Sequence, residues 1–427
     1  MLHPRLVEDL RRLARVGSLA HCSKDGKGRV HGGRNVNTEL QDLLENLIAI
    51  DSQNPGAGEA EIARYVDELA RNLDFDSQIV DTAPGRSNVL VTADAGGPKV
   101  LAFSGHLDTK PVGDAISKWD TLPLELHVRD GLAYGLGTSD MKGAIVCMLV
   151  AAQRWAQSAS SGRLELIFTA DEEAGSEYGA KALCDQGLVE ADALIIGEPS
   201  GISEPWEAIF LVSRGICCFD VVIEGTQGHS GLSERLPTSA TVAAAEAILA
   251  LHNDLELSFE PHPDYDYRPT FNAGVRIEGG VFYAVHPGHA TVSCDIRLVP
   301  GMQLDQLDRQ IREALTNALP KDVDWHLRYR EDQLGWMEPV AIDPGHEVVA
   351  AAQAGCEEAL GRHLPYAAYP GGTDATSFIS MAGIPTIASL GPGWLSVAHG
   401  PNECVGLDQL EQATVLYEAI ARRFLKT

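Results

Sequence analysis

Five short stretches of the sequence carry residue types that bind divalent metal ions. These are His106 in "SGHLDTKP", Asp140 in "GTSDMKG", Glu173 in "DEEAGS", Glu198 in "GEPS" and His399 in "AHGPNE". Two imidazoles and three carboxylates without a thiolate form a ligand set that suits Zn, Mn or Co. One carboxylate must bridge if each of two ions is to receive a normal number of ligands. We therefore expect a site for two divalent metal ions.

Four of these five residues also have an ordinary structural explanation. His106 could be a satisfied core histidine, Asp140 a helix N-cap, Glu173 half of a solvated pair with Glu172, and His399 a loop residue. Their common location favours a site, because each cluster lies where an apolar strand ends or a helix begins. In open α/β sheets the carboxyl ends of the strands line the ligand-binding crevice. We therefore expect the clusters to meet there.

The segments between these clusters alternate between strand and helix patterns. Apolar runs predict strands at 99–105, 163–170, 192–197 and 384–391, and helical periodicity appears at 37–50, 58–74, 140–158, 177–188, 345–361 and 407–425. The strand runs lack a polar alternate face, which is typical of a sheet covered by helices on both sides. The pattern predicts an α/β fold with a doubly wound mixed sheet.

The pattern changes from about residue 211. Strands are predicted at 216–225, 270–279, 290–299 and 323–330, with helices at 238–254 and 304–319. This βαββαβ order is the ferredoxin-like arrangement. We expect a discontinuous catalytic domain, residues 1–210 and 329–427, interrupted by an inserted α+β domain at 211–328.

The motifs resemble those of the M20 family of metallopeptidases and amidohydrolases, which includes acetylornithine deacetylase, succinyl-diaminopimelate desuccinylase and glutamate carboxypeptidase. Seven stretches occur in the family's order, namely "SGHLDTKP", "YGLGTSDMKG", "TADEEAGS", "IIGEPS", "QGHSG", "PGGTDA" and "AHGPNE". The resemblance implies that His106, Asp140 and Glu198 bind one ion. It implies that Asp140, Glu173 and His399 bind the other, so that Asp140 is the bridging ligand.

The resemblance also implies that Asp108 orients His106 and that Glu172 is the general acid/base. A ligating histidine usually donates its second ring N–H to a carboxylate or a carbonyl, and Asp108 is two residues along an extended chain from His106. A salt bridge of Asp108 elsewhere is the alternative. Glu172 would take a proton from water activated by two metal ions and pass it to the leaving nitrogen. The candidate nucleophiles Ser139 and Ser230 lie in no G-x-S-x-G turn, which argues against a serine hydrolase.

Further residues resemble substrate-contact positions of the family, namely His229, Asn272, Arg297, Gly371, Gly372 and Thr373. The resemblance implies that His229 is a lid histidine that stabilises an oxyanion, commonly in the partner subunit's active site. Arg297 suits a substrate carboxylate, with a structural ion pair as the alternative. Lys110 stands where many relatives have an apolar residue. It would either favour an anionic substrate or be a solvated side chain.

Composition and charge narrow the class of protein. The chain has 427 residues and a net charge of -27 that is spread along the sequence, which argues against nucleic acid or an anionic membrane as a partner. The N-terminal stretch "MLHPRLVEDLRRLARVG" has no apolar core of a signal peptide, and no later run reaches membrane-spanning length. The eight cysteines form no C-x-x-C motif. We expect a cytoplasmic protein.

The expected reaction is hydrolysis of an amide bond in an N-acyl amino acid or small peptide. Hydrolysis of another C–N bond, such as that of an aromatic amine or a xenobiotic amide, is the alternative. A non-catalytic binding relative would normally have lost a ligand or the base, and all are present. A homodimer is expected through the inserted domain, because its open strand edge and the apolar helix at 238–253 need cover.

Overall fold

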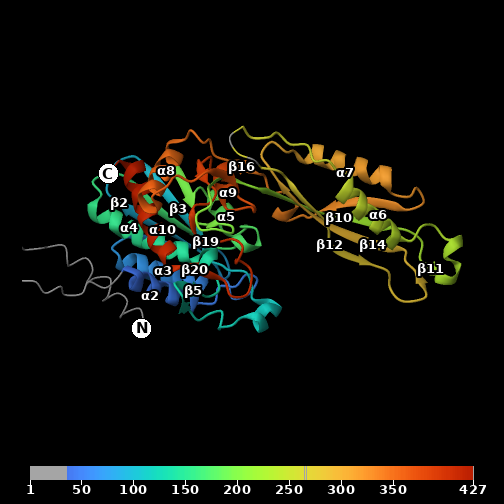
Figure 1. The fold of residues 1–427 in the computed structure, drawn as a ribbon, viewed down its shortest axis with the longest axis horizontal. Helices are drawn as coiled ribbons and strands as arrows, with labels where there is room; N and C mark the ends of the chain where they lie inside the picture. Colours follow the sequence, from blue (N-terminus) through green and yellow to red (C-terminus); the bar gives the residue numbers. More distant parts are fainter. Residues whose placement is uncertain (1–35, 264, 266, 427) are drawn as a thin grey trace, which may run out of the picture. The chain divides into compact units, whose positions relative to one another are not determined.

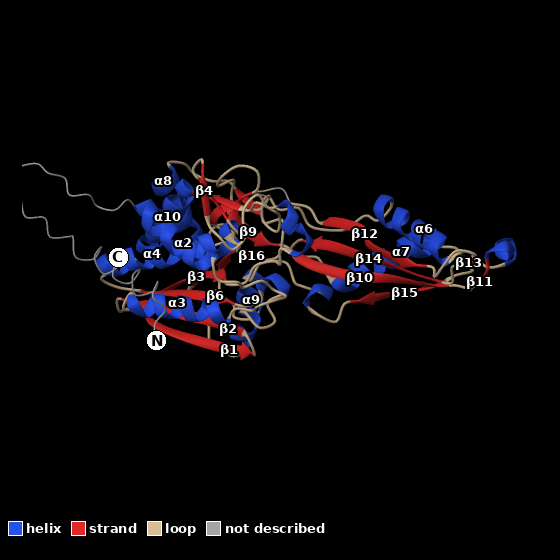
Figure 2. Ribbon diagram, turned by 90° about the horizontal axis from the view of Figure 1, so that it is seen from below, coloured by secondary structure: helices blue, strands red, loops and turns tan. Residues whose placement is uncertain are grey.

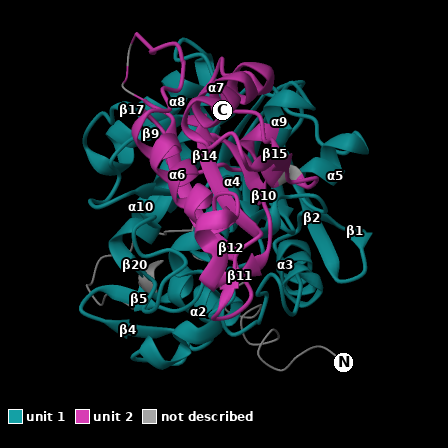
Figure 3. Cartoon of the chain, turned by 90° about the vertical axis from the view of Figure 1, so that its right-hand side faces the viewer, with its two compact units in different colours: residues 1–211, 342–366, 377–427 teal, residues 212–341, 367–376 magenta. Residues whose placement is uncertain are grey.

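The computed structural model describes residues 36–263, 265 and 267–426 (Figure 1). The N-terminal stretch, in which no signal peptide was predicted, lies outside these residues. Two compact units are present (Figure 3). Unit 1 comprises the described residues up to 211, with 342–366 and 377 onward, and unit 2 comprises residues 212–341 and 367–376. Each is described below by itself.

Unit 1 is built around a six-stranded mixed sheet with strand order β1-β2-β6-β3-β7-β18. Its strands are β1 (Asp76–Ala83), β2 (Arg86–Asp94), β3 (Val100–His106), β6 (Arg163–Thr169), β7 (Ala193–Ile196) and β18 (Thr386–Ile387). β3 pairs in parallel with β6 and β7, and β7 pairs in parallel with β18. Every residue of β3 is buried, as the continuous apolar run predicts. The predicted α/β fold with a mixed sheet is confirmed.

The hairpin of β1 and β2 is the part of this sheet that the sequence analysis did not place. β1 pairs antiparallel with β2, which pairs antiparallel with β6. β1 is an edge strand with only one buried residue, Ser77, so it offers no apolar run to recognise. The turn between the strands contains Gly85, whose φ of 78° lies in the left-handed region that favours glycine.

Helices of unit 1 pack against this sheet and against one another (Figure 2). They are α2 (Val36–Ile48), α3 (Ala60–Asn72), α4 (Gly143–Ser158), α5 (Ala180–Asp185), α8 (Glu347–Leu360), α9 (Ala375–Ser380), which continues from unit 2, and α10 (Leu407–Leu425). α3 packs on β1 and β2, while α4 packs on β2, β3 and β6. α10 packs against α4 and α8, and its Tyr417 lies 5.1 Å from Phe103 of β3, measured between ring centroids. This core holds the ends of β3, β6 and β7 in place.

Unit 2 contains a four-stranded antiparallel sheet with strand order β12-β14-β10-β15. The strands are β10 (Gly215–Glu224), β12 (Thr270–Gly279), β14 (His289–Leu298) and β15 (Asp324–Tyr329), and the helices are α6 (Ala240–Asn253) and α7 (Leu304–Ala318). The chain order βαββαβ with the first strand between the third and fourth is ferredoxin-like, as predicted. α6 packs across β10, β12 and β14, and α7 packs beside α6.

Unit 2 extends beyond the predicted insert of 211–328. The reason lies in backbone hydrogen bonds to the start of the unit. Ile216 and Met337 donate to each other's carbonyls, and the Arg214 N–H donates to the Gly371 carbonyl at 3.0 Å. The Thr373 N–H donates to Oγ of Ser213 at 2.9 Å. The Gly371–Thr373 segment therefore falls in unit 2 and not in the predicted catalytic domain.

Short strands complete the two units. They are β4 (His127–Arg129), β5 (Leu132–Tyr134), β8 (Pro199–Gly201), β9 (Ile209–Ser213), β11 (Gly228–His229), β13 (Val285–His286), β16 (Val340–Ala341), β17 (Tyr366–Ala368), β19 (Gly391–Trp394) and β20 (Cys404–Gly406). Among the described residues, no helix is both long enough and apolar enough to span a membrane.

Candidate metal centre

The five predicted metal ligands all lie in unit 1 and come together there. β3 ends at His106, Glu173 follows the end of β6 in the 3-10 turn η3 (Glu172–Ala174), and Glu198 follows the end of β7. Because these three strands are parallel, their ends reach the same edge of the sheet. Asp140 lies in the turn η2 (Thr138–Lys142) before α4, and His399 lies in the loop between β19 and β20.

Asp140 lies between the two histidines, and its two oxygens face different rings. Its Oδ1 is 2.9 Å from Nε2 of His106, and its Oδ2 is 3.1 Å from Nε2 of His399. On the His106 side, Oε1 of Glu198 lies 3.5 Å from the ring nitrogen. On the His399 side, Oε2 of Glu173 lies 3.2 Å from the ring nitrogen. The geometry thus gives two groups of donors that share one carboxylate.

These donors fit a pair of divalent ions. Ligand atoms of His106, Asp140 and Glu173 lie within 4.8 Å of one another. A second group at this spacing, His106, Glu172 and Glu198, brings the predicted acid/base Glu172 beside two ligands, and neither group includes His399. All are nitrogen or carboxylate oxygen, the donors that Zn and Mn take in catalytic sites. A negative carboxylate between two rings is the position that a bridging ligand requires.

The electrostatics of the cluster follow from packing acids and imidazoles together. Burial lowers the pKa of His399, but hydrogen bonds to Asp140 and Glu173 outweigh burial and raise it to about 10. For His106, burial is likewise outweighed by the hydrogen bond to Asp140 and the charge of Glu198, so its pKa lies well above the usual value. Burial raises the pKa of Asp140, yet the two imidazoles reverse this and lower it. Without metal, therefore, the positive charge of the two protonated imidazoles offsets part of the negative charge of the carboxylates.

The carbonyl of Asp108 orients the ring of His106. Nδ1 of His106 lies 2.9 Å from the Asp108 carbonyl oxygen and 3.6 Å from the Asp108 carboxylate oxygen Oδ1. A carbonyl only accepts hydrogen bonds, so Nδ1 donates to it, and Nε2 faces Asp140 and Glu198. Orientation through the backbone of Asp108 differs from the carboxylate contact that the sequence suggested.

The carboxylate of Asp108 instead holds the turn that carries Glu172 and Glu173. Oδ1 accepts the Glu172 N–H at 3.2 Å, and Oδ2 accepts the Glu173 N–H at 3.1 Å. The two glutamates lie in a 3-10 turn, and Asp171 before them has a φ of 63°. Burial raises the pKa of Asp108 to about 7, and the nearby charge of His106 opposes this shift.

Asn54 links Asp108 to a further buried network that the sequence analysis did not identify. Its Nδ2 donates to Asp108 at 3.0 Å and to Asp171 at 2.9 Å. Its Oδ1 accepts from Arg86 at 2.8 Å, and Arg86 also pairs with the buried Glu59 at 2.6 Å. Asn54 lies in "DSQNPG", a turn sequence between two helices, so its type and place in the sequence gave no sign of this role.

Lys110 contacts Glu173 directly. Its Nζ lies 3.2 Å from Oε2 of Glu173 and donates to the Glu173 carbonyl, and the Lys110 N–H donates to Oε1 at 3.1 Å. Burial lowers the pKa of Lys110, but the charges of Glu173 and Glu172 outweigh it and raise the pKa. Lys110 is therefore an ion-pair partner of a predicted ligand and not a freely solvated side chain.

The six predicted substrate-contact residues all lie in unit 2. His229 is exposed, and its Nδ1 accepts the Gly231 N–H at 3.0 Å, which places the proton of the neutral ring on Nε2. Arg297 forms an ion pair with Asp295 of the same strand at 3.1 Å, and 32% of its side chain stays exposed. Asn272 lies opposite Asp295 in the β12-β14 pairing.

Arg214 is a further residue that the sequence analysis missed. Its side chain is half-buried, and its buried Nε has no hydrogen-bond partner among the described residues. Burial and the positive charge of Arg297 lower the pKa of Arg214. A buried guanidinium N–H without an acceptor, close to a second arginine, is suited to receive an anion. The neighbouring apolar strand residues gave no sign of this in the sequence.

The comparisons with known proteins agree on one family. The model of Peptidase family M20/M25/M40 matches residues 102–423. A succinyl-diaminopimelate desuccinylase of Legionella pneumophila (strain Lens) is 28% identical over 403 residues, covering 91% of this chain and 99% of that protein.

Solved structures share the fold. An M20 family metallo-carboxypeptidase of Sulfolobus solfataricus matches with a TM-score of 0.73 at 20% identity, over 91% of this chain and 100% of that one. The Bacillus subtilis YXEP protein, a dinuclear metal binding peptidase, matches with a TM-score of 0.63 at 16% identity, over 92% and 98% of the chains.

Proposed function

Since the chain belongs to Peptidase family M20/M25/M40, we propose that it hydrolyses an amide bond of an N-acyl amino acid or small peptide with the help of two divalent metal ions. The observation that carries the proposal is the shared carboxylate of Asp140, with one oxygen facing His106 and the other facing His399. We propose Zn, Co or Mn as the ions, because the donors are imidazole and carboxylate.

The chain's own residues supply the rest of the chemistry. Bound divalent ions would act as Lewis acids that polarise the substrate carbonyl and lower the pKa of a water molecule. Glu172 is our candidate base, since its carboxylate lies within 4.8 Å of ligand atoms of His106 and Glu198. It would take the proton of the attacking water and give it to the leaving nitrogen. Asp108 holds Glu172 in place through the backbone N–H.

We propose a substrate with a carboxylate group. Arg214 and Arg297 support this, because one has a buried donor without an acceptor and both are positively charged. The relative from Legionella is named for a succinylated substrate, whose acyl group carries a carboxylate. A bidentate pairing with arginine would select such a group over a neutral one.

We also propose a homodimer, formed through unit 2, in which His229 serves the partner's site. Arg297 pairs with Ile216 at one end of the β10-β14 pairing, whereas β11 with His229 follows the other end of β10 (Figure 1). Arg297 lies beside Ile216, and the segment that carries His229 starts after Glu224. The eight residue steps from Ile216 to Glu224 span about 26 Å at roughly 3.3 Å per residue, so Arg297 and His229 lie at opposite ends of β10. One small substrate is too short to touch both residues of the same chain. A second chain is the simplest source of His229.

An exposed apolar surface on unit 2 supports this dimer. β12 is an edge strand of the sheet, with Val275 59% and Ile277 58% exposed, and α6 beside it exposes Val242 and Leu249. An open edge with apolar side chains invites pairing with an identical edge, which would give a closed two-fold dimer. The cytoplasm remains our proposed location. Six cysteines of the described residues support it, because they are thiols and not disulfides, namely Cys147, Cys217, Cys218, Cys294, Cys356 and Cys404.

The proposed reaction is tested by chelation and metal return. Prolonged chelation is expected to abolish hydrolysis of a panel of N-acyl amino acids and dipeptides, and Zn, Co or Mn to restore it. Aromatic amines belong in the same panel, with released amine or ammonia as the measurement. Full activity in a preparation shown to be free of metal would refute the proposal. Turnover of aromatic amines, without turnover of N-acyl amino acids or dipeptides, would show that the proposed substrate class is wrong.

A further inference from the structure

Glu403 has a fully enclosed carboxylate that binds the backbone of the turn carrying Asp140. Glu403 as a whole is 2% exposed. Oε2 accepts the Gly137 N–H at 2.8 Å, and Oε1 accepts the N–H groups of Ser139 at 2.9 Å and Asp140 at 3.0 Å. Three backbone donors directed at one carboxylate are far more than a surface glutamate collects.

The main chain around Glu403 reinforces the same contact. The Gly135 N–H donates to the Glu403 carbonyl at 3.0 Å, and the Ser139 hydroxyl donates to the Cys404 carbonyl at 2.7 Å. β20, which begins at Cys404, pairs with β5 just before the turn. The turn is thus fastened along its length to the segment that starts at Glu403.

Glu403 also lies in the loop that carries His399, between β19 and β20. Asp140 and His399 are far apart in the sequence, and their side chains face each other at 3.1 Å. Glu403 is four residues from His399 and bonds directly to the N–H of Asp140. Its carboxylate therefore fixes the distance between a ligand near the start of α4 and a ligand near the end of the chain.

We propose that Glu403 is a positioning residue of the metal centre, which holds the backbone of Asp140 so that its two carboxylate oxygens face His106 and His399. This inference rests on the proposed two-metal function. Without Glu403, three buried N–H groups lose their acceptor, and the turn must move toward other acceptors. A shifted Asp140 would no longer serve both ions equally. Partners outside the ligands themselves typically change metal affinity by 10- to 100-fold.

Two substitutions separate the parts of this role. In Glu403→Gln the amide oxygen can keep the bonds from Ser139 and Asp140, but its NH2 group faces the Gly137 N–H and cannot accept it. In Glu403→Asp the carboxyl group is kept, but the side chain is one methylene shorter and draws the oxygens away from the turn. We expect each variant to bind metal about 10- to 100-fold more weakly than wild type.

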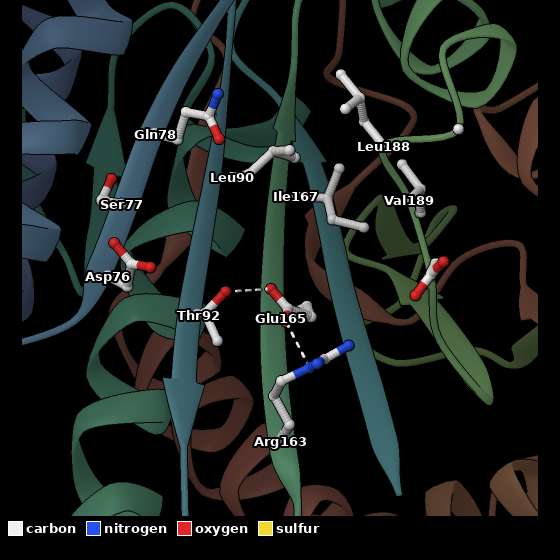
Figure 4. A pocket seen from close by; sticks show the side chains of 12 residues that line it. Asp76, Ser77, Gln78, Leu90, Thr92, Arg163, Glu165, Ile167, Leu188 and Val189 are labelled. Atoms are coloured by element: carbon white, nitrogen blue, oxygen red, sulfur yellow. Dashed lines mark hydrogen bonds and ion pairs between the residues drawn. The ribbon is translucent and has the colours of Figure 1, made fainter. Parts of the chain in front are cut away.

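Glu165 supplies the matched control (Figure 4). This glutamate of β6 is also largely buried, accepts from the Thr92 hydroxyl at 2.7 Å and pairs with Arg163 at 2.8 Å. It lines a hollow of about 360 Å³ on the sheet and contacts none of the predicted ligands. Glu165→Gln is expected to leave metal affinity unchanged, even if it lowers the stability of unit 1.

The experiment measures metal affinity, ligand geometry and backbone protection together. Chelated proteins are titrated with Co(II) while its visible absorption is recorded, and hydrogen exchange of residues 137–142 is followed by mass spectrometry. We expect weaker binding, an altered Co(II) spectrum and faster exchange of the three amides in both Glu403 variants. Unchanged affinity and spectrum in a folded Glu403→Gln protein would overturn the proposal.

The wild-type protein gives a test that does not depend on a variant folding. The amides of Gly137, Ser139 and Asp140 should be protected from exchange in chelated wild type, and rapid exchange there would also overturn the proposal. Failure of the proposed function is distinguishable. A wild type that binds two ions but hydrolyses no amide would refute the reaction and leave the role of Glu403 intact.

Discussion

Glu172 and Glu173 are adjacent, yet we assign them different tasks, and substitution should separate them. Glu172→Gln removes the proposed base but no ligand, so metal content should stay near wild type while kcat falls by about 10² to 10⁴-fold, the usual size of general acid/base catalysis. Metal analysis and steady-state kinetics measure both quantities. If kcat were unchanged, the base would have to be another group.

Asp140→Ala provides the contrasting outcome at the same site. It removes the carboxylate that both His106 and His399 contact. We expect loss of metal from both sites with retained folding, as measured by metal analysis and circular dichroism. Retention of two ions per chain in this variant would argue against a bridging role for Asp140.

The raised pKa of His399 predicts how metal affinity depends on pH. In the metal-free protein the pKa of His399 is raised to about 10, so the folded state holds this proton between pH 6.5 and 10 where the unfolded state releases it. The resulting stability is fully present below pH 6.5 and is lost as the pH rises toward 10. A metal ion must displace the proton, so apparent affinity should rise by up to about tenfold per pH unit near pH 7.

Calorimetry in buffers of different ionisation enthalpy measures this linkage directly. At pH 7 we expect at least one proton to be released for each pair of ions bound, with His399→Ala releasing fewer. Binding heats that do not depend on the buffer would contradict the protonated state of His399 in the metal-free protein.

At the scale of elements, sequence patterns located the strands that carry ligands but not the contacts that orient them. Continuous apolar runs identified β3, β6 and β7, and parallel pairing then placed His106, Glu173 and Glu198 at one edge. The hairpin of β1 and β2 escaped because β1 is an exposed edge. Asn54 escaped because hydrogen bonds between residues far apart in the sequence leave no periodic pattern.

Asn54 also contributes to stability. It donates hydrogen bonds to Asp108, which holds the turn of Glu172 and Glu173, and to Asp171, which precedes that turn. Asn54→Ala leaves the buried carboxylates of Asp108 and Asp171 without a shared donor. We expect the free energy of unfolding to fall by about 1 to 3 kcal/mol, the cost of unsatisfied buried polar groups. Urea denaturation measures this change. The substitution Gln78→Ala, at an exposed residue of β1, is a suitable control. An equal loss of unfolding free energy in that variant would show that the loss in Asn54→Ala does not come from its buried hydrogen bonds.

At the scale of the whole molecule, mixed dimers test whether His229 acts across subunits. A His229→Ala chain and a Glu172→Gln chain should each be nearly inactive alone. If His229 serves the partner's site, one site of the mixed dimer has both residues intact and activity should reappear. No recovery despite proven subunit exchange would place His229 in its own chain's site or outside catalysis.

A charged residue on the proposed dimer surface tests the assembly itself. Ile277→Lys places a charge on the exposed edge strand β12, where it would be buried between two chains. We expect a monomer by analytical ultracentrifugation, with metal still bound in unit 1 but little activity. The exposed Val128→Lys of β4 is the control that should leave the assembly unchanged. A wild type that is monomeric would refute the dimer.

The discontinuity of unit 1 has a consequence for how the protein is made. Four of the five proposed ligands precede residue 199, but His399 and Glu403 are synthesised only after the whole of unit 2. The last parallel strand β18 and the β20 strand that pairs with β5 also come late. A nascent chain that stops before residue 399 therefore lacks both the last ligand and the carboxylate that fixes the Asp140 turn. Metal loading is accordingly expected only after unit 2 and the segment with His399 and Glu403 have been synthesised.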